Sequence, residues 1–290
     1  MKLLITGAGG QLGLALARRL SAQHVLITLA RGQLDISDAK ACSETLEAAR
    51  PDVLLNCAAY TAVDRAETDR DSAFAINADG PRNLANACRE LGIFPIHFST
   101  DYVFDGTASA PYSEDAATNP ICVYGESKLA GEAALANASI AYLIFRLSWV
   151  YSNDGVNFYK TMLRLGAERS QLRVVADQVG IPNYTGDIAD AIARVLDLNR
   201  QELVARTGIY HLSATGPTSW CDFARSIFSG AQMSDRVAVE AISTSEYKTT
   251  AERPAYSVLD ARRSTATFGV PVLDWRAGLQ RCLAERTMTV

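Results

Sequence analysis

The chain has 290 residues, of which 48% are hydrophobic and 21% charged, and its formal net charge is -4. This is the composition of an ordinary globular protein, with enough chain for one large domain or two unequal ones. An acidic balance without a basic run argues against nucleic acid as a partner, and no apolar stretch approaches the roughly 18 residues of a membrane span.

The cysteines and histidines give no sign of a metal site. Six cysteines are scattered without a C-x-x-C pair, which is typical of the reduced thiols of a cytoplasmic protein. His24, His97 and His211 are the three histidines, and none has another histidine or a cysteine close to it in the chain, which argues against zinc. Because the chain begins with an apolar strand, we expect neither a signal peptide nor a membrane span.

The first predicted element is a short strand over residues 2–6, followed by a glycine-rich turn and a helix over residues 14–20. Strand, turn and helix in this order are the context that a dinucleotide-binding fingerprint requires. Gly7 would make the tight turn, Gly10 would let the backbone approach a pyrophosphate, and Gly13 would allow the helix to pack closely on the strand. The pyrophosphate would then lie at the helix N-terminus, where free N–H groups and the macrodipole favour an anion.

Strand-like and helix-like segments alternate along the first half of the chain. Predicted strands cover residues 25–29, 53–55, 93–98 and 142–147, and the predicted helices between them cover 38–50, 72–91 and a segment beginning near Tyr124. This alternation predicts an α/β fold of the Rossmann type, a doubly wound parallel sheet with right-handed crossovers.

Beyond about residue 150 the alternation loosens, because Gly, Pro and Tyr interrupt shorter segments. We therefore expect a dinucleotide-binding domain over residues 1–150, with return segments near 185–213, and a smaller α/β substrate-binding lobe formed mainly by residues 151–290. A ligand of an open α/β sheet binds beyond the carboxyl ends of the strands, so the substrate should lie between the two parts.

The end of the second strand bears on the choice of cofactor. No carboxylate stands where an NAD-specific enzyme would hold the ribose hydroxyls, and Arg31 stands there instead. A guanidinium there can meet a 2′-phosphate, so we expect NADPH, although a solvated surface arginine is the alternative interpretation. Asp35 can face the adenine or the ribose, so use of NADH is also expected. The cofactor-binding residues predicted from the glycine turn and the second strand are Gly7, Gly10, Gln11, Leu12, Gly13, Arg31, Asp35 and Ile36.

Tyr124 and Lys128 are four residues apart, so on a helix their side chains project from the same face. An ammonium beside a phenol favours the phenolate, which predicts a lowered pKa for Tyr124. Such a pair can donate and accept the proton of a carbonyl/alcohol couple. Thr100, at the end of a strand, is predicted to offer its hydroxyl to the same oxygen, so the predicted catalytic residues are Thr100, Tyr124 and Lys128.

Several segments resemble known families. The Gly-x-x-Gly-x-x-Gly turn, Asn56-x-Ala-Ala, Ser-Thr100-Asp101 and Tyr124-x-x-x-Lys128 occur in the order found in extended short-chain dehydrogenases. This resemblance implies further cofactor-binding residues, which are Asn56, Ala58, Ala59, Tyr60, Phe98, Tyr124 and Lys128. Other segments resemble the dTDP-4-dehydrorhamnose reductase family, so that the resemblance runs essentially end to end. These segments are residues 56–67, 99–106, 145–151, 157–163, 177–182, 210–212 and 253–260.

The resemblance implies NAD(P)H-dependent reduction of the 4-keto group of a dTDP-sugar to dTDP-L-rhamnose, for cell-surface polysaccharide. Two alternatives remain open. One is a reductase of a related nucleotide sugar, or one that gives the other 4-epimer; the other is a non-catalytic regulatory subunit of the methionine adenosyltransferase type. The intact set of Thr100, Tyr124 and Lys128 argues against a regulatory subunit, which needs no acid at this place.

The substrate contacts are predicted at Thr100, Asp101, Trp149 and Arg253. Asp101 is implied by the resemblance, with a turn-forming Asp as the alternative. Trp149 offers a flat apolar face for a sugar or base, unless it is a core side chain. Arg253 can hold a diphosphate with its guanidinium fork, or it forms a surface salt bridge.

One departure from the family concerns assembly. Some members pair through Mg²⁺ that is held by carboxylates, one of them on the first helix, whereas residues 14–19 contain no acidic residue here. We therefore expect no Mg²⁺ at the first helix and a monomer or weak homodimer. The expected partner is a dTDP-sugar, with no nucleic acid and no membrane.

Overall fold

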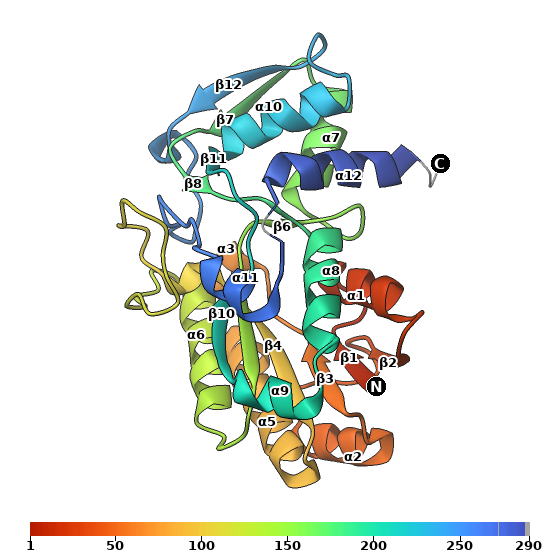
Figure 1. Cartoon of the computed structure of the whole chain (residues 1–290). Coiled ribbons are helices and arrows are strands. Elements are labelled where there is room, and N and C mark those ends of the chain that lie inside the picture. Colours follow the sequence, from red (N-terminus) through yellow and green to blue (C-terminus); the bar gives the residue numbers. More distant parts are fainter. Residues whose placement is uncertain (272, 288–290) are drawn as a thin grey trace.

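A computed structural model describes residues 1–271 and 273–287. At its centre is a six-stranded sheet with the order β10-β5-β4-β3-β1-β2, in which every neighbouring pair is parallel (Figure 1). The strands are β1 (Lys2–Thr6), β2 (Val25–Leu29), β3 (Val53–Asn56), β4 (Phe94–Thr100), β5 (Leu143–Leu147) and β10 (Gly208–His211). The strand order reverses between β1 and β3, and such a switch point is where doubly wound sheets bind their ligands.

Helices cover both faces of this sheet. On one face α1 (Gln11–Leu20) packs against α8 (Thr185–Leu196), and on the other α2 (Ala39–Ala49), α5 (Gly80–Leu91) and α6 (Val123–Ala136) pack in a row. Alternate residues of β1 serve the two cores: Leu3 and Ile5 belong to the α1/α8 side, and Leu4 to the α2/α5 side. A strand buried on both faces needs this nearly continuous apolar sequence.

The predicted helix over residues 72–91 is divided in the structure. It consists of α4 (Arg70–Phe74), a single π-helical turn η1 (Ala75–Asp79) and α5. Helix α6 approaches this turn so closely that a Cβ on Gly131 would lie 2.1 Å from the carbonyl oxygen of Asn77. The irregular turn therefore determines where α6 lies, and α6 carries Tyr124 and Lys128.

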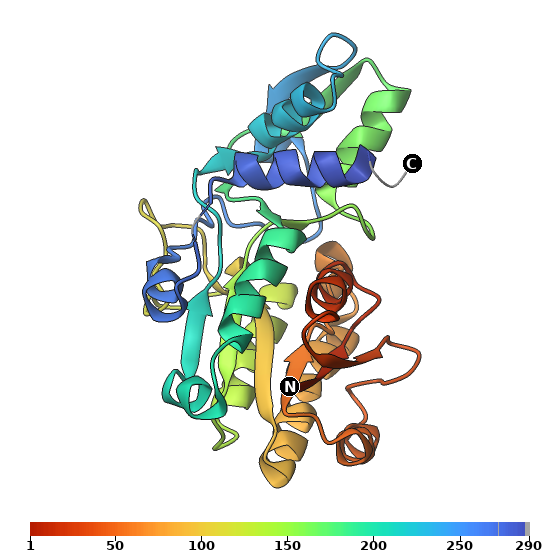
Figure 2. The same ribbon diagram turned by 45° about the vertical axis from the view of Figure 1, so that its right-hand side comes forward.

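A second group of elements has its own apolar core and lies beyond the carboxyl ends of the strands (Figures 1 and 2). Its strands are β6 (Val150–Tyr151), β7 (Gln171–Val175), β8 (Val179–Gly180), β9 (Asn183–Tyr184), β11 (Thr218–Ser219) and β12 (Ala238–Ile242). Its helices are α7 (Phe158–Glu168), α10 (Trp220–Gly230) and α12 (Trp275–Thr287). Strand β10 and helix α8 lie in the segment near 185–213 that was expected to return, and they join the main sheet and its covering layer.

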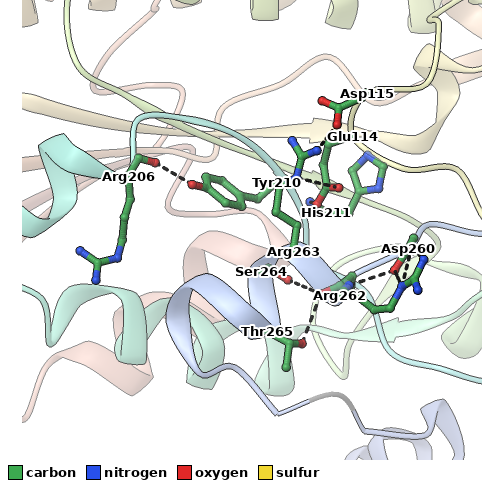
Figure 3. Close-up of polar contacts among 11 residues, drawn as sticks. Glu114, Asp115, Arg206, Tyr210, His211, Asp260, Arg262, Arg263, Ser264 and Thr265 are labelled. Atoms are coloured by element: carbon green, nitrogen blue, oxygen red, sulfur yellow. Dashed lines mark hydrogen bonds and ion pairs between the residues drawn. The ribbon is translucent and has the colours of Figure 1, made fainter.

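The remaining elements are short. They are α3 (Val63–Ala66), η2 (Asp101–Val103), α9 (Arg200–Ala205), η3 (Thr244–Glu246) and α11 (Arg262–Phe268). Helix α11 is joined to the loop between η2 and α6 by ion pairs of Arg263 with Glu114 and Asp115 (Figure 3). Glu114 also accepts the backbone N–H of His211 in β10 at 3.0 Å. These contacts bring the C-terminal part of the chain back to the edge of the main sheet.

Candidate active site

The glycine turn after β1 forms a tight cradle. Gly7 has a φ of +63°, and a Cβ there would lie 2.5 Å from the backbone nitrogen of Ala58. A Cβ on Gly13 would lie 2.5 Å from the carbonyl oxygen of Gly7. Helix α1 begins directly afterwards, with Gly10 as its N-cap and no side chain capping it. Backbone N–H groups at an uncapped helix start, with no Cβ in the way, fit the pyrophosphate of a dinucleotide.

Two predicted cofactor residues near the turn have other partners in this structure. The side-chain oxygen of Gln11 accepts hydrogen bonds from Ser152 and Asn157, so this side chain joins helix α1 to the second group of elements. Ile36 is buried, and its side chain fills the space beside Gly80. Ile36 therefore packs in the core below the second strand.

The two charged residues after β2 are exposed, as a role at the adenosine end requires. Arg31 lies on the surface and is close enough to Asp35 to help hold the pKa of that carboxyl down. The larger cause of this lowered pKa is Ser37, whose hydroxyl and backbone N–H both donate to Asp35. Asp35 therefore stays an anion close to Arg31.

Beyond β3, the segment Asn56–Tyr60 faces α6. Asn56 is buried and its side-chain oxygen accepts hydrogen bonds from Thr6 Oγ1 and from the backbone of Ala58. The backbone of Tyr60 is held by Asn77, which accepts from its N–H and donates to its carbonyl, and Asn77 also donates to Ser127 in α6. Asn77 lies in a predicted helix, but nothing in the sequence indicates these hydrogen bonds, because they depend on the π-helical turn.

Thr100, Tyr124 and Lys128 come together at the end of β4. The hydroxyl of Thr100 donates to Asp101 Oδ1 at 3.0 Å and lies close enough to the Tyr124 phenol to affect its pKa. Lys128 is buried, and its Nζ donates to the backbone carbonyl of Phe98 at 2.7 Å. Phe98 thus meets Lys128 through its backbone oxygen.

The protonation of the Tyr–Lys pair differs from the sequence prediction. Burial raises the pKa of Tyr124, only partly offset by the hydrogen bond with Thr100, and burial lowers the pKa of Lys128 to about 8. The predicted lowering of the Tyr124 pKa by Lys128 is wrong for this arrangement, because Nζ is directed to the Phe98 carbonyl. Low polarity disfavours the charged form of both groups.

Asp101 is a buried carboxyl next to this pair. Burial raises its pKa to about 7, although the neighbouring hydroxyls of Ser257 and Thr100 favour the anion. Its Oδ2 atom has no hydrogen-bond partner among the described residues. A buried, unpaired oxygen beside the reacting hydroxyls fits a substrate contact, as predicted for Asp101.

Trp149 and Arg253 are already engaged in this structure. The ring of Trp149 stacks on Trp220 with centroids 3.5 Å apart, and the backbone of Gly180 lies against the same ring. Trp149 has a φ of 42°, a strained conformation for a bulky residue directly before β6, and such strain gathers at functional sites. Sequence reasoning missed Trp220, because nothing local connects residues so far apart.

Arg253 forms a two-point ion pair with Asp64, with Nη2–Oδ2 and Nη1–Oδ1 distances of 2.7 and 3.1 Å. The guanidinium is close enough to Tyr102 to affect the pKa of that phenol. Backbone of the neighbouring Pro254 lies against Gly106, where a Cβ would meet it at 2.6 Å. Arg253 is therefore beside the site, but a diphosphate would have to share it with Asp64.

Arginines surround the acidic residues near the first helix. Arg19 pairs with Asp190, and Arg281 pairs with both Asp187 and Asp190. Over residues 1–271 and 273–287 no group of three or more His, Cys, Asp or Glu side chains is arranged to hold a metal ion. In the same residues no helix is long and apolar enough to cross a membrane.

Comparisons with known proteins show the family to which the chain belongs and support the fold. The family model for the RmlD substrate binding domain matches residues 1–288. The chain is 41% identical to a dTDP-4-dehydrorhamnose reductase of Burkholderia thailandensis, over 98% of this chain and 99% of the relative. Its structure is similar to that of a dTDP-4-dehydrorhamnose reductase of Clostridium acetobutylicum, with a TM-score of 0.94 and 39% identity, covering 99% and 100% of the two chains. The Bacillus anthracis reductase in complex with NADP gives a TM-score of 0.92 and 39% identity, covering 98% and 99%.

Proposed function

Because the chain belongs to the RmlD family, whose relatives include dTDP-4-dehydrorhamnose reductases, we propose that it uses NADPH to reduce the 4-keto group of dTDP-4-dehydro-L-rhamnose. The product is dTDP-L-rhamnose, a precursor for cell-surface polysaccharide. The observation that carries this proposal is the meeting of Thr100, Tyr124 and Lys128 at the strand ends beside the glycine cradle.

The chain supplies the proton of the reaction, and NADPH supplies the hydride when bound. With a raised pKa, Tyr124 is fully protonated at neutral pH and can donate its proton to the oxygen that develops charge at C4. Thr100 lies between the Asp101 carboxyl and the phenol, so its hydroxyl can turn to the same oxygen. Asp101 would contact the sugar through its unpaired oxygen.

The cofactor would be held by residues that follow strands β1 and β2 and by Lys128 on helix α6. Gly7, Gly10 and Gly13 would meet the pyrophosphate, and Arg31 would meet the 2′-phosphate that distinguishes NADPH from NADH. Lys128 would bind the ribose next to the nicotinamide. The division into a cofactor part over residues 1–150 and a substrate part over 151–290 belongs to this proposal, as do a cytoplasmic location and a monomer or weak homodimer.

Turnover with purified dTDP-4-dehydro-L-rhamnose tests the proposal. The wild-type protein should oxidise NADPH only when the sugar is present, and NMR of the product should show the rhamno configuration. Tyr124→Phe should lower kcat by about 10²–10⁴, the usual contribution of a general acid, while the affinity for NADPH stays within about twofold. A talo product would replace the proposed sugar with its 4-epimer, and full activity of Tyr124→Phe would refute the proton donor.

A further inference from the structure

A row of buried polar side chains crosses the centre of the sheet. Thr6, Asn56 and His97 are register partners on β1, β3 and β4, and Lys128 of α6 lies over the end of the row. None of the four side chains belongs to a residue more than 4% exposed. Polar groups so deep in a core must form hydrogen bonds with one another, so the donor and the acceptor of each contact can be assigned one after another along the row.

Two hydrogen bonds to the side-chain oxygen of Asn56 fix the orientation of its amide. Its oxygen accepts the backbone N–H of Ala58 at 3.2 Å and the hydroxyl of Thr6 at 2.7 Å. Because a backbone N–H can only donate, the amide cannot be turned around without placing two donors together. The Asn56 NH₂ group therefore faces His97 Nδ1, at 3.0 Å.

This contact in turn fixes the tautomer of His97. An amide nitrogen can only donate, so Nδ1 of His97 must accept and carries no proton. Burial lowers the pKa of His97 well below its ordinary value, with Lys128 acting in the same direction, so the ring is neutral. A neutral imidazole with a bare Nδ1 holds its proton on Nε2.

The Nε2 atom lies 3.4 Å from Nζ of Lys128. An N–H that points at Nζ forms a hydrogen bond only if Nζ offers a lone pair, as an uncharged amine does and an ammonium does not. We propose that Asn56 and His97 act as a positioning pair for Lys128. Asn56 orients the His97 ring so that its N–H faces Nζ, and this contact favours the amine form of Lys128 over the ammonium.

Other groups around Nζ act on the same balance. Glu132, one turn further along α6, favours the ammonium, and the carbonyl of Phe98 accepts from Nζ in either form. Burial raises the pKa of the Cys57 thiol, which is therefore uncharged and offers no counterion. Tyr124 is uncharged for the same reason. His97 is thus the neighbour whose Nε2–H disfavours the Lys128 ammonium, whereas Glu132 favours it.

This inference rests on the proposed function only for its catalytic consequence. Once Tyr124 has given its proton to the product oxygen, a proton must pass from the Lys128 ammonium to the phenolate, which leaves an amine and restores the phenol. The N–H of His97 can then donate to the amine that this step produces. His97 stabilises the state from which Lys128 is reprotonated, and so it affects the reaction through Lys128 alone.

The chain is well suited to a direct test by NMR, because it has only three histidines and five lysines. Nitrogen-15 spectra of histidine-labelled protein should show one ring, absent in His97→Gln, with a bare Nδ1 and a protonated Nε2. Carbon-13 labels at lysine Cε should show one signal, absent in Lys128→Met, that titrates below the other four. A protonated Nδ1 on His97 would overturn the proposal.

A second experiment replaces His97 and so removes the Nε2–H that faces Nζ. His97→Gln can present a carbonyl oxygen to Nζ, so the Lys128 titration should move up by about one pH unit, the effect expected when an acceptor replaces a facing donor. His97→Asn is too short to reach Nζ and should give a smaller upward shift, which keeps the test open if the glutamine variant does not fold. An unchanged titration in a folded His97 variant would refute the proposal.

His211 is the matched control, since it is equally buried in the same sheet but lies on β10. His211→Gln should leave the Lys128 titration within about 0.2 pH units of wild type, a margin small beside the one-unit shift expected above. If the protein also turns over the proposed sugar, the alkaline limb of its kcat–pH profile should move up with the Lys128 titration in His97→Gln. The NMR titrations need no substrate, so failure of the proposed reaction would leave them standing.

Discussion

The buried ion pair of Glu132 and Arg146 yields a prediction whose size follows from the structure. Both side chains are at most 4% exposed, and the guanidinium meets the carboxylate at two points, with distances of 2.9 and 2.7 Å. Arg146 also lies over the ring of Phe104, and its third nitrogen, Nη1, has no hydrogen-bond partner among the described residues. Glu132 is therefore the carboxylate that compensates this buried charge.

Replacing Glu132 with Gln keeps the shape and one acceptor but leaves the guanidinium without a counterion. Breaking a buried pair in this way costs about 3–5 kcal/mol in the free energy of unfolding. At about 2–4 °C per kcal/mol, Tm should fall by roughly 6–20 °C. Because Glu132 also favours the Lys128 ammonium, the variant should lower the pKa of Lys128 further below its present value of about 8.

Urea unfolding followed by circular dichroism measures the first effect, and lysine Cε titration measures the second. Glu44→Gln is the matched control, because Glu44 pairs with Lys40 on an exposed helix face where the side chains are 66% and 83% exposed. Such a pair contributes at most about 0.5 kcal/mol. A loss below about 1 kcal/mol in Glu132→Gln would show that the buried charge is compensated elsewhere, and the reasoning would fail.

Three further predictions concern the site. The pKa of Asp101 is raised from 3.8 to about 7, so between these pH values the folded state binds a proton that the unfolded state has lost. The free energy of unfolding should therefore fall as pH rises from about 4 to about 7, by up to about 1.4 kcal/mol per pH unit. Urea unfolding at several pH values should show this fall in the wild type and not in Asp101→Asn. Gly13→Ala, whose Cβ would lie 2.5 Å from a carbonyl, should lower Tm in calorimetry far more than Gly9→Ala, whose nearest neighbour is 3.8 Å away. Arg31→Ala should raise KM for NADPH by about tenfold and leave KM for NADH nearly unchanged in steady-state assays.

The elements that could be predicted from the sequence are those encoded by a short local pattern. Apolar strands, a glycine turn and a helical Tyr-x-x-x-Lys are each encoded within a few residues, and parallel strands place their carboxyl ends at one edge. Thr100 and Tyr124 could therefore be assigned to one site from the order of the segments that carry them. The six-stranded parallel sheet confirms the predicted fold class.

Contacts between distant segments could not be read in this way. The Asp64 partner of Arg253 is 189 residues away, and the stacking of Trp149 on Trp220 depends on how β8 and α10 pack. In the sequence, His97 is one of three scattered histidines and lies within the predicted strand over residues 93–98. Its role depends on the register that places it beside Asn56, and register is a property of the assembled sheet.

The direction of the Tyr124 shift illustrates the same limit and has a chemical consequence. A helix places Lys128 on the same face as Tyr124, but the sequence does not say where Nζ points, and Nζ turns to the Phe98 carbonyl. Burial then acts on both groups alike: it keeps the proton on Tyr124 and weakens the hold of Lys128 on its own. An acid that must protonate an alkoxide has to hold its proton until the oxygen becomes basic, and a neighbour that releases a proton readily can then restore it. Opposite shifts of the two pKa values therefore suit a proton donor and its resupply better than the lowered phenol pKa that the spacing alone suggested.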